Sequence, residues 1–313
     1  MYVVIATADR QGLLRRTLES LAACRKPDSY RGTIVVENGP KGGAEEVVCE
    51  YGSPLGAEYM YVSVGNKSLA LNAVLEHVDD CLMVFADDDV RLHPDTLCAY
   101  AEAAQSDPCD RFYGGPTGVD YEVHPPKWIL QYLPPSAKGW RAEPGTTLMT
   151  KPLFMGANWV AFAHDLRRVG GFDVSKGPGA TSGSTGQETD MQVRLLQAGL
   201  VGRYVPGAMV WHFVPASRCS REWALTRAHR KGIAQGLNVC ASGGPTLLNY
   251  PPRVCAEWAK RALKALVWSV GGSGARFRSC FYFRLYAGYM KGMALRSRHL
   301  LPTSTLSEVR GDG

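Results

Sequence analysis

Short apolar runs alternate with helix-like stretches along the first third of the chain. Runs typical of buried strands occupy residues 2–7, 32–37, 59–64 and 82–86. Between them, leucines recur at helical spacing in residues 11–23 and 68–77. Strands that alternate with helices are typical of a mainly parallel sheet with helices packed against it. The pattern therefore predicts an α/β fold.

Further along the chain this regular alternation stops. A helix is predicted over residues 96–105 and a strand over 112–116, but residues 120–150 are rich in proline and aromatic side chains. This composition predicts an irregular segment that carries a short helix at 128–132. A glycine-rich stretch at 175–186 comes directly before Glu188, and we interpret it as a mobile loop that could act as a lid.

The last third of the chain is predicted to be helical and basic. Residues 1–217 hold 19 Lys and Arg against 25 Asp and Glu, whereas residues 218–313 hold 16 against 4. We therefore expect one domain over 1–217 and a helical basic C-terminal region over 218–313. Helical spacing predicts its helices at 221–232, 255–270 and 277–295.

The basic region is compatible with two kinds of environment. Apolar residues fall near one face of the second predicted helix, beside Lys and Arg: Val254, Trp258, Ala262, Leu266 and Val270. Such a face can lie on an anionic membrane surface, or it can pack onto its own domain. We expect no nucleic-acid partner, because no recognition motif accompanies the basic residues.

No feature of the chain predicts export or membrane insertion. The apolar stretches are far shorter than the roughly 20 residues of a membrane-spanning helix, and Met1 leads directly into the first strand without a secretory signal. Nine cysteines occur without a CxxC pair, which is typical of reduced thiols. We expect a cytoplasmic protein, placed at the inner face of the membrane if the basic helices attach there.

Three adjacent carboxylates, Asp87, Asp88 and Asp89, follow the strand predicted at 82–86. Ligands of open α/β sheets bind at the carboxyl ends of the strands. A divalent cation such as Mg²⁺ or Mn²⁺ would relieve the repulsion and would bridge the carboxylates to a substrate diphosphate. Asp87 and Asp89 would project to the same side of an extended chain, with Asp88 turned aside. An isolated triplet of this kind also fits a solvated acidic turn.

The segments around the triplet resemble those of one enzyme family. IATADRQGLLRRTLESL, IVVENG, GNKSLALN, VFADDDV, VGGFD, GQETDMQVRLLQAG and VWH follow one another as in the family 2 glycosyltransferases of the GT-A fold. The resemblance spans residues 2–232. It implies a Rossmann-like nucleotide-binding half, 1–118, joined to an acceptor-binding half, 119–217. It also implies a metal-dependent, inverting transfer of a sugar to an acceptor hydroxyl, in glycan, polysaccharide or glycoconjugate synthesis.

The resemblance implies where the nucleotide-sugar donor binds. Contacts are expected from Thr7, Asp9, Arg10, Glu37, Lys67, Asn72, Asp87, Asp88 and Gly156. Glu37 departs from the family, which has an Asp at the position that meets the base, and a strand-end surface carboxylate is the alternative. Lys67 fits a phosphate contact or a solvated lysine at a helix start. Gly156 lies in 154–158, which resembles the strand beneath the donor sugar, where glycine permits close approach.

The expected metal ligands are Asp89, Asp87 and His212. The histidine resembles the late histidine that completes the metal site in many enzymes of this fold, and neutral imidazole is compatible with Mn²⁺. A lone histidine at a strand end also has a purely structural interpretation. Glu188 takes the position of the family's general base, although Gln187-Glu188 replaces the usual Glu-Asp. The alternative is a carboxylate favoured by the N-terminus of a helix predicted over 189–197, where Asp190 would pair with Arg194.

The acceptor is expected to be a glycan or a lipid-linked molecule. Trp128, Tyr132 and Trp140 could stack on sugar faces, or could pack to hold the irregular segment in place. Two other functions are compatible with the chain. A nucleotidyltransferase would need a Gly-rich phosphate loop after the first strand, where only Gly12 is found. A catalytically degenerate protein that binds a glycan or nucleotide would explain the departures at Glu37 and Gln187.

Overall fold

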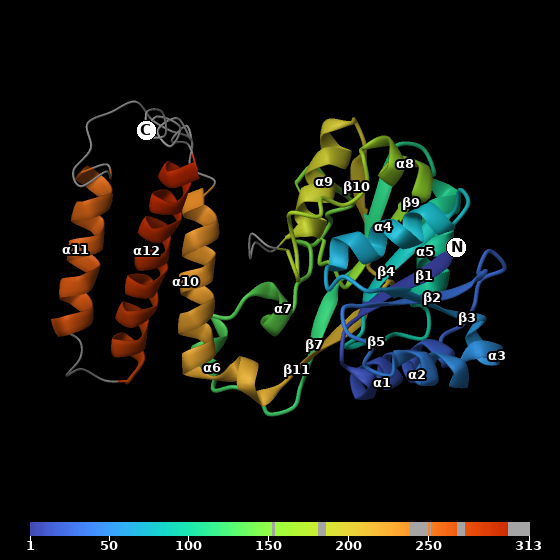
Figure 1. Cartoon of the computed structure of the whole chain (residues 1–313), viewed down its shortest axis with the longest axis horizontal. Helices are drawn as coiled ribbons and strands as arrows, with labels where there is room; N and C mark the ends of the chain where they lie inside the picture. The colour runs from blue at the N-terminus through green and yellow to red at the C-terminus, as the bar shows by residue number, and fades with distance from the viewer. Residues whose placement is uncertain (152–153, 181–185, 238–249, 251, 268–272, 300–313) are drawn as a thin grey trace, which may run out of the picture. The chain divides into compact units, whose positions relative to one another are not determined.

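The computed structural model describes residues 1–151, 154–180, 186–237, 250, 252–267 and 273–299. The chain divides into two compact units (Figure 1). The first comprises Met1–Glu122 and Pro134–Pro215, and the second comprises Val123–Leu133 and Ala216–Gly313. The segment Val123–Leu133, which lies within the expected acceptor half, thus belongs to the helical unit. The division of function between 1–118 and 119–217 stays a prediction.

An eight-stranded sheet forms the centre of the first unit. Four neighbouring strands run parallel, β9 is antiparallel to both of its neighbours, β6 and β10 are parallel, and β8 closes the edge antiparallel to β10. The predicted mainly parallel α/β sheet is therefore confirmed. The order across the sheet is β3 (Ala57–Val62), β2 (Gly32–Asn38), β1 (Tyr2–Thr7), β4 (Leu82–Asp87), β9 (Asn158–Phe162), β6 (Arg111–Gly114), β10 (Val201–Tyr204) and β8 (Leu148–Met149).

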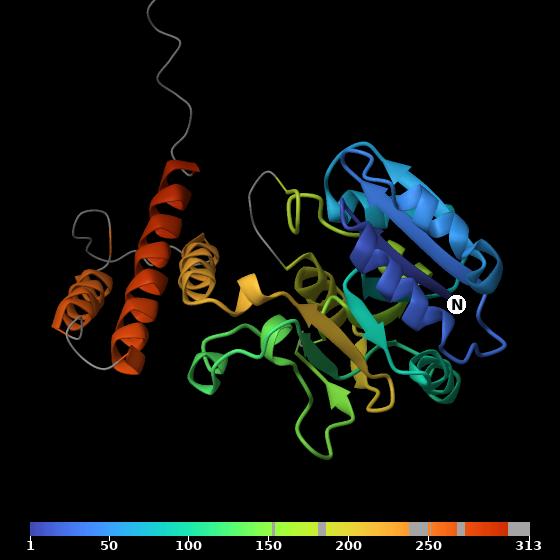
Figure 2. The same ribbon diagram turned by 90° about the horizontal axis from the view of Figure 1, so that it is seen from below.

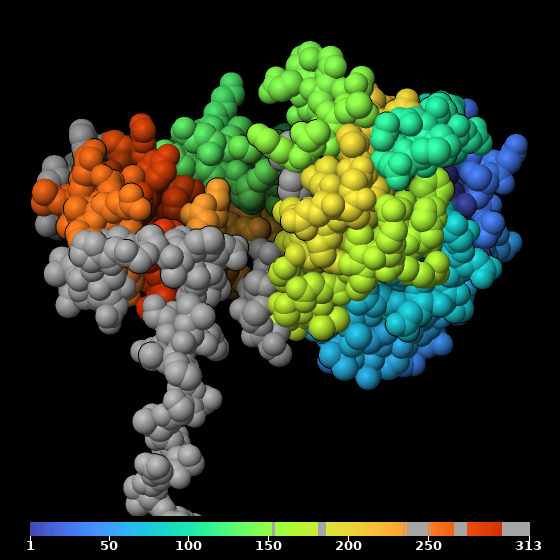
Figure 3. All heavy atoms as spheres, turned by 90° about the horizontal axis from the view of Figure 1, so that it is seen from above, coloured from blue at the N-terminus to red at the C-terminus, as the bar shows by residue number. Residues whose placement is uncertain are grey.

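Helices cover both faces of this sheet because alternate strand residues are apolar on both sides. Val3 and Ile5 of β1 share one core with the helices α1 (Gln11–Ala22), α2 (Ala44–Glu50), α3 (Gly52–Leu55) and α5 (Thr96–Ser106). Val4 and Ala6 share the other core with α4 (Lys67–His77), α8 (Ala163–Arg168) and α9 (Gln187–Gln197). On that second face α4 lies beside α8, and α8 beside α9 (Figure 3).

A second, three-stranded sheet extends the first unit beside the carboxyl end of β4. Its order is β5 (Val90–Leu92), β11 (Val210–Val214) and β7 (Thr117–Tyr121). β11 is antiparallel to β5 and parallel to β7. Since β4 ends at Asp87 and β5 begins at Val90, the acidic triplet forms the link between the two sheets.

Two predicted strands lie at shifted positions. The strand expected at 59–64 begins two residues earlier, and Val64 is exposed beyond its end. The strand expected at 154–158 is wrong, because β9 begins only at Asn158. The backbone N–H and C=O of Phe154 are instead bound by the side-chain amide of Gln192, at 3.1 and 2.9 Å. The Gln192 side chain therefore occupies the N–H and C=O of Phe154 that a neighbouring strand would need for pairing.

The second unit is helical. It contains α6 (Lys127–Leu130), the 3₁₀ turn η1 (Ala216–Cys219), α10 (Arg221–Leu237), α11 (Pro252–Val267) and α12 (Ser273–His299). α10 and α12 lie side by side (Figures 1 and 2). They run parallel, since His229 lies opposite Gly288 whereas Ile233 lies opposite Gly292. Among the helices that the structure describes, none has the length and apolar character needed to cross a membrane.

Glycines allow α10 and α12 to touch backbone to backbone. Gly236 on α10 faces Gly292 on α12, and Gly232 and Gly288 each lie against the backbone of the other helix, so that each helix contributes a pair of glycines four residues apart. A Cβ on Gly288 would overlap the carbonyl oxygen of His229, and a Cβ on Gly292 would lie 3.0 Å from the Cα of Gly236. This packing of small residues is the type that brings helix backbones closest together.

Candidate functional site

The acidic triplet lies at the carboxyl end of the parallel strands. Asp87 ends β4 beside Ala6 of β1, and Asp88 and Asp89 are both buried in the turn that follows. Buried carboxylates are costly unless charges or hydrogen bonds compensate them. Two side chains from neighbouring segments supply that compensation.

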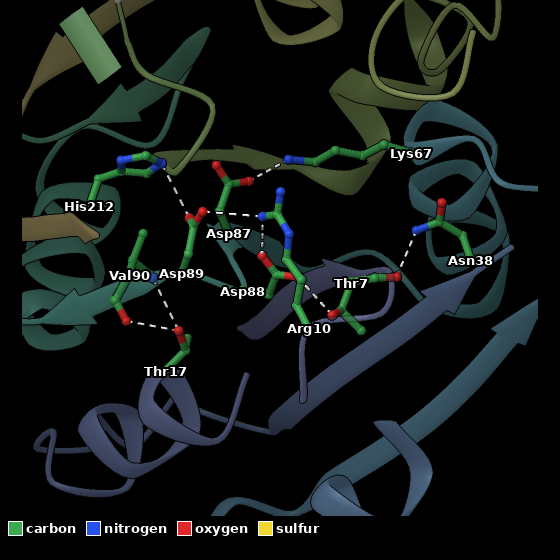
Figure 4. Close-up of polar contacts among 10 residues, drawn as sticks. All are labelled: Thr7, Arg10, Thr17, Asn38, Lys67, Asp87, Asp88, Asp89, Val90 and His212. Carbon is green, nitrogen blue, oxygen red and sulfur yellow. Dashed lines mark hydrogen bonds and ion pairs between the residues drawn. The ribbon is translucent and has the colours of Figure 1, made fainter. Parts of the chain in front are cut away.

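Arg10 and Lys67 are the cations of the site (Figure 4). Nη1 of Arg10 lies 3.1 Å from Oδ1 of Asp88 and 3.2 Å from Oδ2 of Asp89, and Nζ of Lys67 pairs with Oδ1 of Asp87. Asp88 also accepts a hydrogen bond of 2.7 Å from the Thr7 hydroxyl. Arg10 follows β1 and Lys67 begins α4, so the two cations reach the triplet from different sides.

The pKa values of the site follow from burial and from these ion pairs. Burial raises the pKa of Asp87, but the charge and hydrogen bond of Lys67 together with the other positive groups nearby outweigh it and leave the pKa below its usual value. Burial would lower the pKa of Lys67, yet the charge and hydrogen bond of Asp87, with smaller contributions from neighbouring carboxylates, together raise it. For Asp88 burial dominates, and its pKa is raised because Arg10 and Thr7 offset burial only in part. The Asp87–Lys67 pair is therefore held charged, whereas ionised Asp88 is under strain.

A metal-compatible group lies beside these ion pairs. The ligand atoms of Asp87, Asp89 and His212 all lie within 4.8 Å of one another. Nε2 of His212 is 3.3 Å from Oδ1 of Asp89, and its buried Nδ1 has no hydrogen-bond partner among the described residues. The strand pairing of His212 with Val90 fixes this approach. Two carboxylates and an imidazole fit a divalent cation of the Mn²⁺ type.

Glu188 lies in the first turn of α9 and faces Gly156. A Cβ added to Gly156 would lie 3.0 Å from the carboxyl carbon of Glu188. Both residues line a small pocket with Lys67, over the stacked rings of Phe85 and Trp159, whose centroids are 4.7 Å apart. Burial lowers the pKa of Lys67, whereas Asp87 and, to a smaller extent, the charge of Glu188 raise it. The predicted base and the predicted donor-side lysine therefore share one pocket.

The start of α9 is held by a network of ion pairs. Asp190 accepts from Nε of Arg194 at 2.9 Å, which confirms the predicted pair one turn apart. The other carboxylate oxygen of Asp190 pairs with Lys176, which also lies 3.4 Å from Asp173. Glu188 therefore projects from a helix end that is anchored on its outer side.

The segment 172–178 is bound to the start of α4 through backbone groups. Asn72 binds the backbone of Phe172, accepting at 2.7 Å and donating at 2.8 Å, and its contact with the donor stays a prediction. The amide of Asn66, the hydroxyl of Ser68 and the backbone N–H of Lys67 donate to the carbonyls of Val174, Lys176 and Pro178, respectively. Part of the predicted lid, 175–180, is therefore docked, and 181–185 lies outside the described residues.

Glu37 is buried and fully engaged within the protein. Its Oε1 accepts from the backbone N–H groups of Gly42 at 2.7 Å and Ala44 at 3.4 Å, and its Oε2 accepts from the Tyr59 hydroxyl at 2.6 Å. The alternative of a surface carboxylate is therefore wrong. Asp9 is exposed and left-handed, with φ of 53°, and Gly42 lies beside it. Contacts of Glu37 and Asp9 with a nucleoside stay predictions.

The aromatic side chains of the irregular segment pack against other parts of the chain. Trp128 and Tyr132 contact Phe277 of α12, with ring centroids 5.0 and 5.1 Å apart. Trp140 contacts Phe154 and Tyr204 at 6.0 and 5.7 Å. These contacts correspond to the packing interpretation of all three residues. Stacking of a sugar on any of them stays a prediction.

The predicted apolar stripe of the basic region is partly packed as well. The Trp258 ring lies 5.9 Å from that of Phe283 on α12, and Val254 and Ala262 are half-buried. The side chains of Leu266 and Val270 lie outside the described residues. Leu263, off the predicted stripe, is exposed.

Comparisons with known proteins give the family and the fold of the chain. The family model described as "Glycosyltransferase like family 2" matches residues 1–233. The fold is similar to that of mannosyltransferase PcManGT from Pyrobaculum calidifontis, in complex with GDP-Man and Mn²⁺, with a TM-score of 0.57 and 18% identity over 93% of this chain and 86% of that one. It is also similar to residues 1–349 of S. aureus TarS in complex with UDP, with a TM-score of 0.50 and 12% identity over 95% and 91% of the two chains.

No curated protein sequence matches the chain. The similar structures are glycosyltransferases of the GT-A fold, and the predicted fold is confirmed. The family model covers the triplet, Gly156, Glu188 and His212, and it ends inside α10. The chain therefore belongs to the glycosyltransferase-like family 2.

Proposed function

We propose that this glycosyltransferase moves a sugar from a nucleoside diphosphate to an acceptor hydroxyl in a single, inverting displacement. The observation that carries the proposal is the convergence of two groups at the carboxyl end of β4. Asp87, Asp89 and His212 form the metal-compatible group, and Glu188 shares a pocket with Lys67. A general base beside a site for a diphosphate is what an inverting transfer requires.

The chain's own residues have distinct parts in this reaction. Asp87, Asp89 and His212 would hold a divalent cation, which when bound offsets charge on the leaving diphosphate. Lys67 keeps a positive charge next to Asp87 and can donate to a phosphate oxygen. Glu188 accepts the proton of the acceptor hydroxyl as the new glycosidic bond forms. Gly156 leaves room for this carboxylate.

Two nucleotides are the first candidates for the donor. PcManGT is described with GDP-Man and Mn²⁺, and TarS with UDP. We propose that the base binds near the ends of β1 and β2, where Asp9 and Glu37 lie, and that the metal is Mn²⁺ or Mg²⁺. Screening of GDP- and UDP-sugars for hydrolysis and thermal stabilisation, with Mn²⁺, Mg²⁺ or EDTA, would identify the donor. Lack of any response would favour a catalytically degenerate binding protein.

The acceptor is proposed to be a glycan or a lipid-linked molecule. In the latter case, the basic helical unit would contact an anionic membrane surface. Sedimentation with anionic and with zwitterionic vesicles tests this part separately. Binding to the anionic vesicles alone, weakened by salt, is the expected result. If the protein sediments to the same extent with anionic and with zwitterionic vesicles, contact with an anionic membrane surface is removed from the proposal.

The role of Glu188 is tested by Glu188→Gln, which keeps the shape of the side chain but cannot accept the proton. Transfer should fall about 10²- to 10⁴-fold, while donor stabilisation of the protein is retained. Glu46→Gln is the matched control, because Glu46 is an exposed carboxylate in the first turn of α2. Near-normal transfer by Glu188→Gln would contradict the assignment.

A further inference from the structure

Arg10 occupies a position that the resemblance to glycosyltransferases did not predict. The resemblance implies only that Arg10 contacts the donor, whereas in the structure its guanidinium bridges Asp88 and Asp89 at 3.1 and 3.2 Å (Figure 4). Asp89 is also a member of the metal-compatible group. One carboxylate is therefore shared between a resident cation of the chain and a divalent cation that the site would hold.

We propose that Arg10 is an internal counter-ion that competes with the metal for Asp89, so that the metal binds tightly only together with the donor diphosphate. This inference rests on the proposed function, because it assigns the metal and the diphosphate to the same site. Arg10 is here a positioning residue, which acts through Asp88 and Asp89.

The charges of the site support competition. Arg10 and Lys67 place two positive charges next to the three carboxylates of the triplet. Both aspartates that Arg10 contacts are buried, so the attraction is only weakly screened by water. A divalent cation that arrives alone meets carboxylates that are already largely neutralised. It must also displace a charge-assisted hydrogen bond to Asp89.

A diphosphate changes this balance. It brings at least two negative charges, which give Arg10 and Lys67 new partners with a geometry that guanidinium and ammonium groups bind well. The side chain of Arg10 is 41% exposed, so it is free to turn toward a ligand, whereas Asp88 and Asp89 are fixed in the turn. The diphosphate therefore draws Arg10 away from Asp89 and opens that carboxylate to the metal, and the metal in turn releases Arg10 to bind the diphosphate. This is positive coupling between the two binding events.

The test measures binding of Mn²⁺ alone, by titration of the free-ion EPR signal, to wild type and to Arg10→Met. Met keeps the length of the side chain but removes its charge and its hydrogen bonds. We expect Arg10→Met to bind Mn²⁺ at least about tenfold more tightly than wild type at low ionic strength. Loss of a structural residue would weaken a metal site, so a gain in affinity separates competition from simple support of the fold.

The control is Arg15→Met. Arg15 lies on α1 and pairs with the exposed Glu50, so this variant changes the net charge equally without touching the triplet. It should bind Mn²⁺ like wild type. Equal or weaker binding by Arg10→Met would overturn the competition. Absence of Mn²⁺ binding in every variant would instead count against the proposed metal site, which distinguishes the two failures.

The coupling is measured by repeating the titrations with GDP or UDP, corrected for Mn²⁺ that the nucleotide binds in solution. Wild type should gain Mn²⁺ affinity with the correct nucleotide, and Arg10→Met should gain several-fold less. Should that variant not fold, arginine-labelled wild type can be titrated with Mg²⁺ and followed by NMR. The Arg10 guanidinium signal should shift while that of Arg15 does not, and an unmoved Arg10 signal would overturn the proposal.

Discussion

Gly156 lies so close to Glu188 that even one added methyl group would press on the carboxylate. The Cβ of an alanine at this position would be 3.0 Å from the Cδ of Glu188 and 3.1 Å from its Cγ. Gly156→Ala should therefore push the proposed base away from the acceptor. Displacement of a catalytic group by about 1 Å can cost about 10²-fold in rate, so transfer should fall by roughly 10- to 100-fold, with unfolding little affected.

A matched glycine distinguishes this effect from the general cost of adding a methyl group. No heavy atom lies within 4 Å of the Cβ position of Gly12, which is part of helix α1. Gly12→Ala should leave transfer intact and raise the free energy of unfolding by up to about 1 kcal/mol. Steady-state kinetics of both variants measure the transfer rate, and denaturant unfolding measures their free energy of unfolding. Full activity in Gly156→Ala would show that Glu188 is not confined there.

Asn72 should stabilise the turn at Phe172 through its two hydrogen bonds to the backbone of that residue. Asn72→Ala would leave the N–H and C=O of Phe172 without their partners, at a cost of about 1–3 kcal/mol in the free energy of unfolding. Glu76→Ala, on an exposed position of the same helix, should change it by no more than about 0.5 kcal/mol. Urea unfolding measures both, and equal small effects would contradict the structural role.

Asp88 should make the stability of the protein depend on pH. Burial raises the pKa of Asp88 above its ordinary value of 3.8, so the folded state prefers the protonated form. The penalty for ionised Asp88 is absent below the unfolded pKa and complete above the raised folded pKa. Asp88→Asn cannot ionise, so its Tm relative to wild type should increase as the pH rises from about 4 to about 8.

Circular dichroism melts across that pH range test this prediction. Asp88→Asn also loses a contact with Arg10, which lowers the Tm of the variant at every pH. The quantity to compare is therefore the change with pH of the Tm difference between variant and wild type, and not the sign of that difference at one pH. Asp28→Asn, at an exposed carboxylate, serves as the control for solvent effects. A Tm difference for Asp88→Asn that stays constant would contradict the prediction.

The contact between α10 and α12 should not tolerate a methyl group. Gly292→Ala would drive a Cβ into the carbonyl oxygen of Ile233, and overpacking of this kind costs about 1–3 kcal/mol. Gly274→Ala, near the start of the same helix, meets no atom within 4 Å and should be neutral. Hydrogen exchange of α10 and α12 gives the local stability. Unchanged protection in Gly292→Ala would argue against the close crossing.

The pattern of apolar and charged residues along the chain predicted the strands and the helical ion pair, because these depend on residues close together in the sequence. β1 has its predicted limits, β4 extends its predicted range by one residue, and Asp190 pairs with Arg194 one turn away. The acidic triplet was found because three carboxylates at a strand end are conspicuous in any sequence. Periodicity and short motifs carry this information because they reflect the geometry of single elements.

Long-range partners were not predictable in the same way. Arg10 meets Asp88 across 78 positions, and no local signal distinguishes it from other arginines after a strand. Glu37 lies one residue before the end of β2, yet its neighbours in space, Gly42 and Tyr59, determine that it is held inside the protein. The false strand at 154–158 has the same cause, because Gln192 lies 38 positions away.

The docking of 172–178 on α4 has a consequence for how this chain can change. Three carbonyl groups, two residues apart, accept the hydrogen bonds that join this stretch to the start of the lysine-bearing helix. Every amino acid supplies a carbonyl, so these three hydrogen bonds do not themselves depend on which side chains stand at Val174, Lys176 and Pro178. Removal of one residue would slide all three acceptors away from their donors. The docking therefore constrains the length of this stretch more strictly than the side chains at its three acceptor positions.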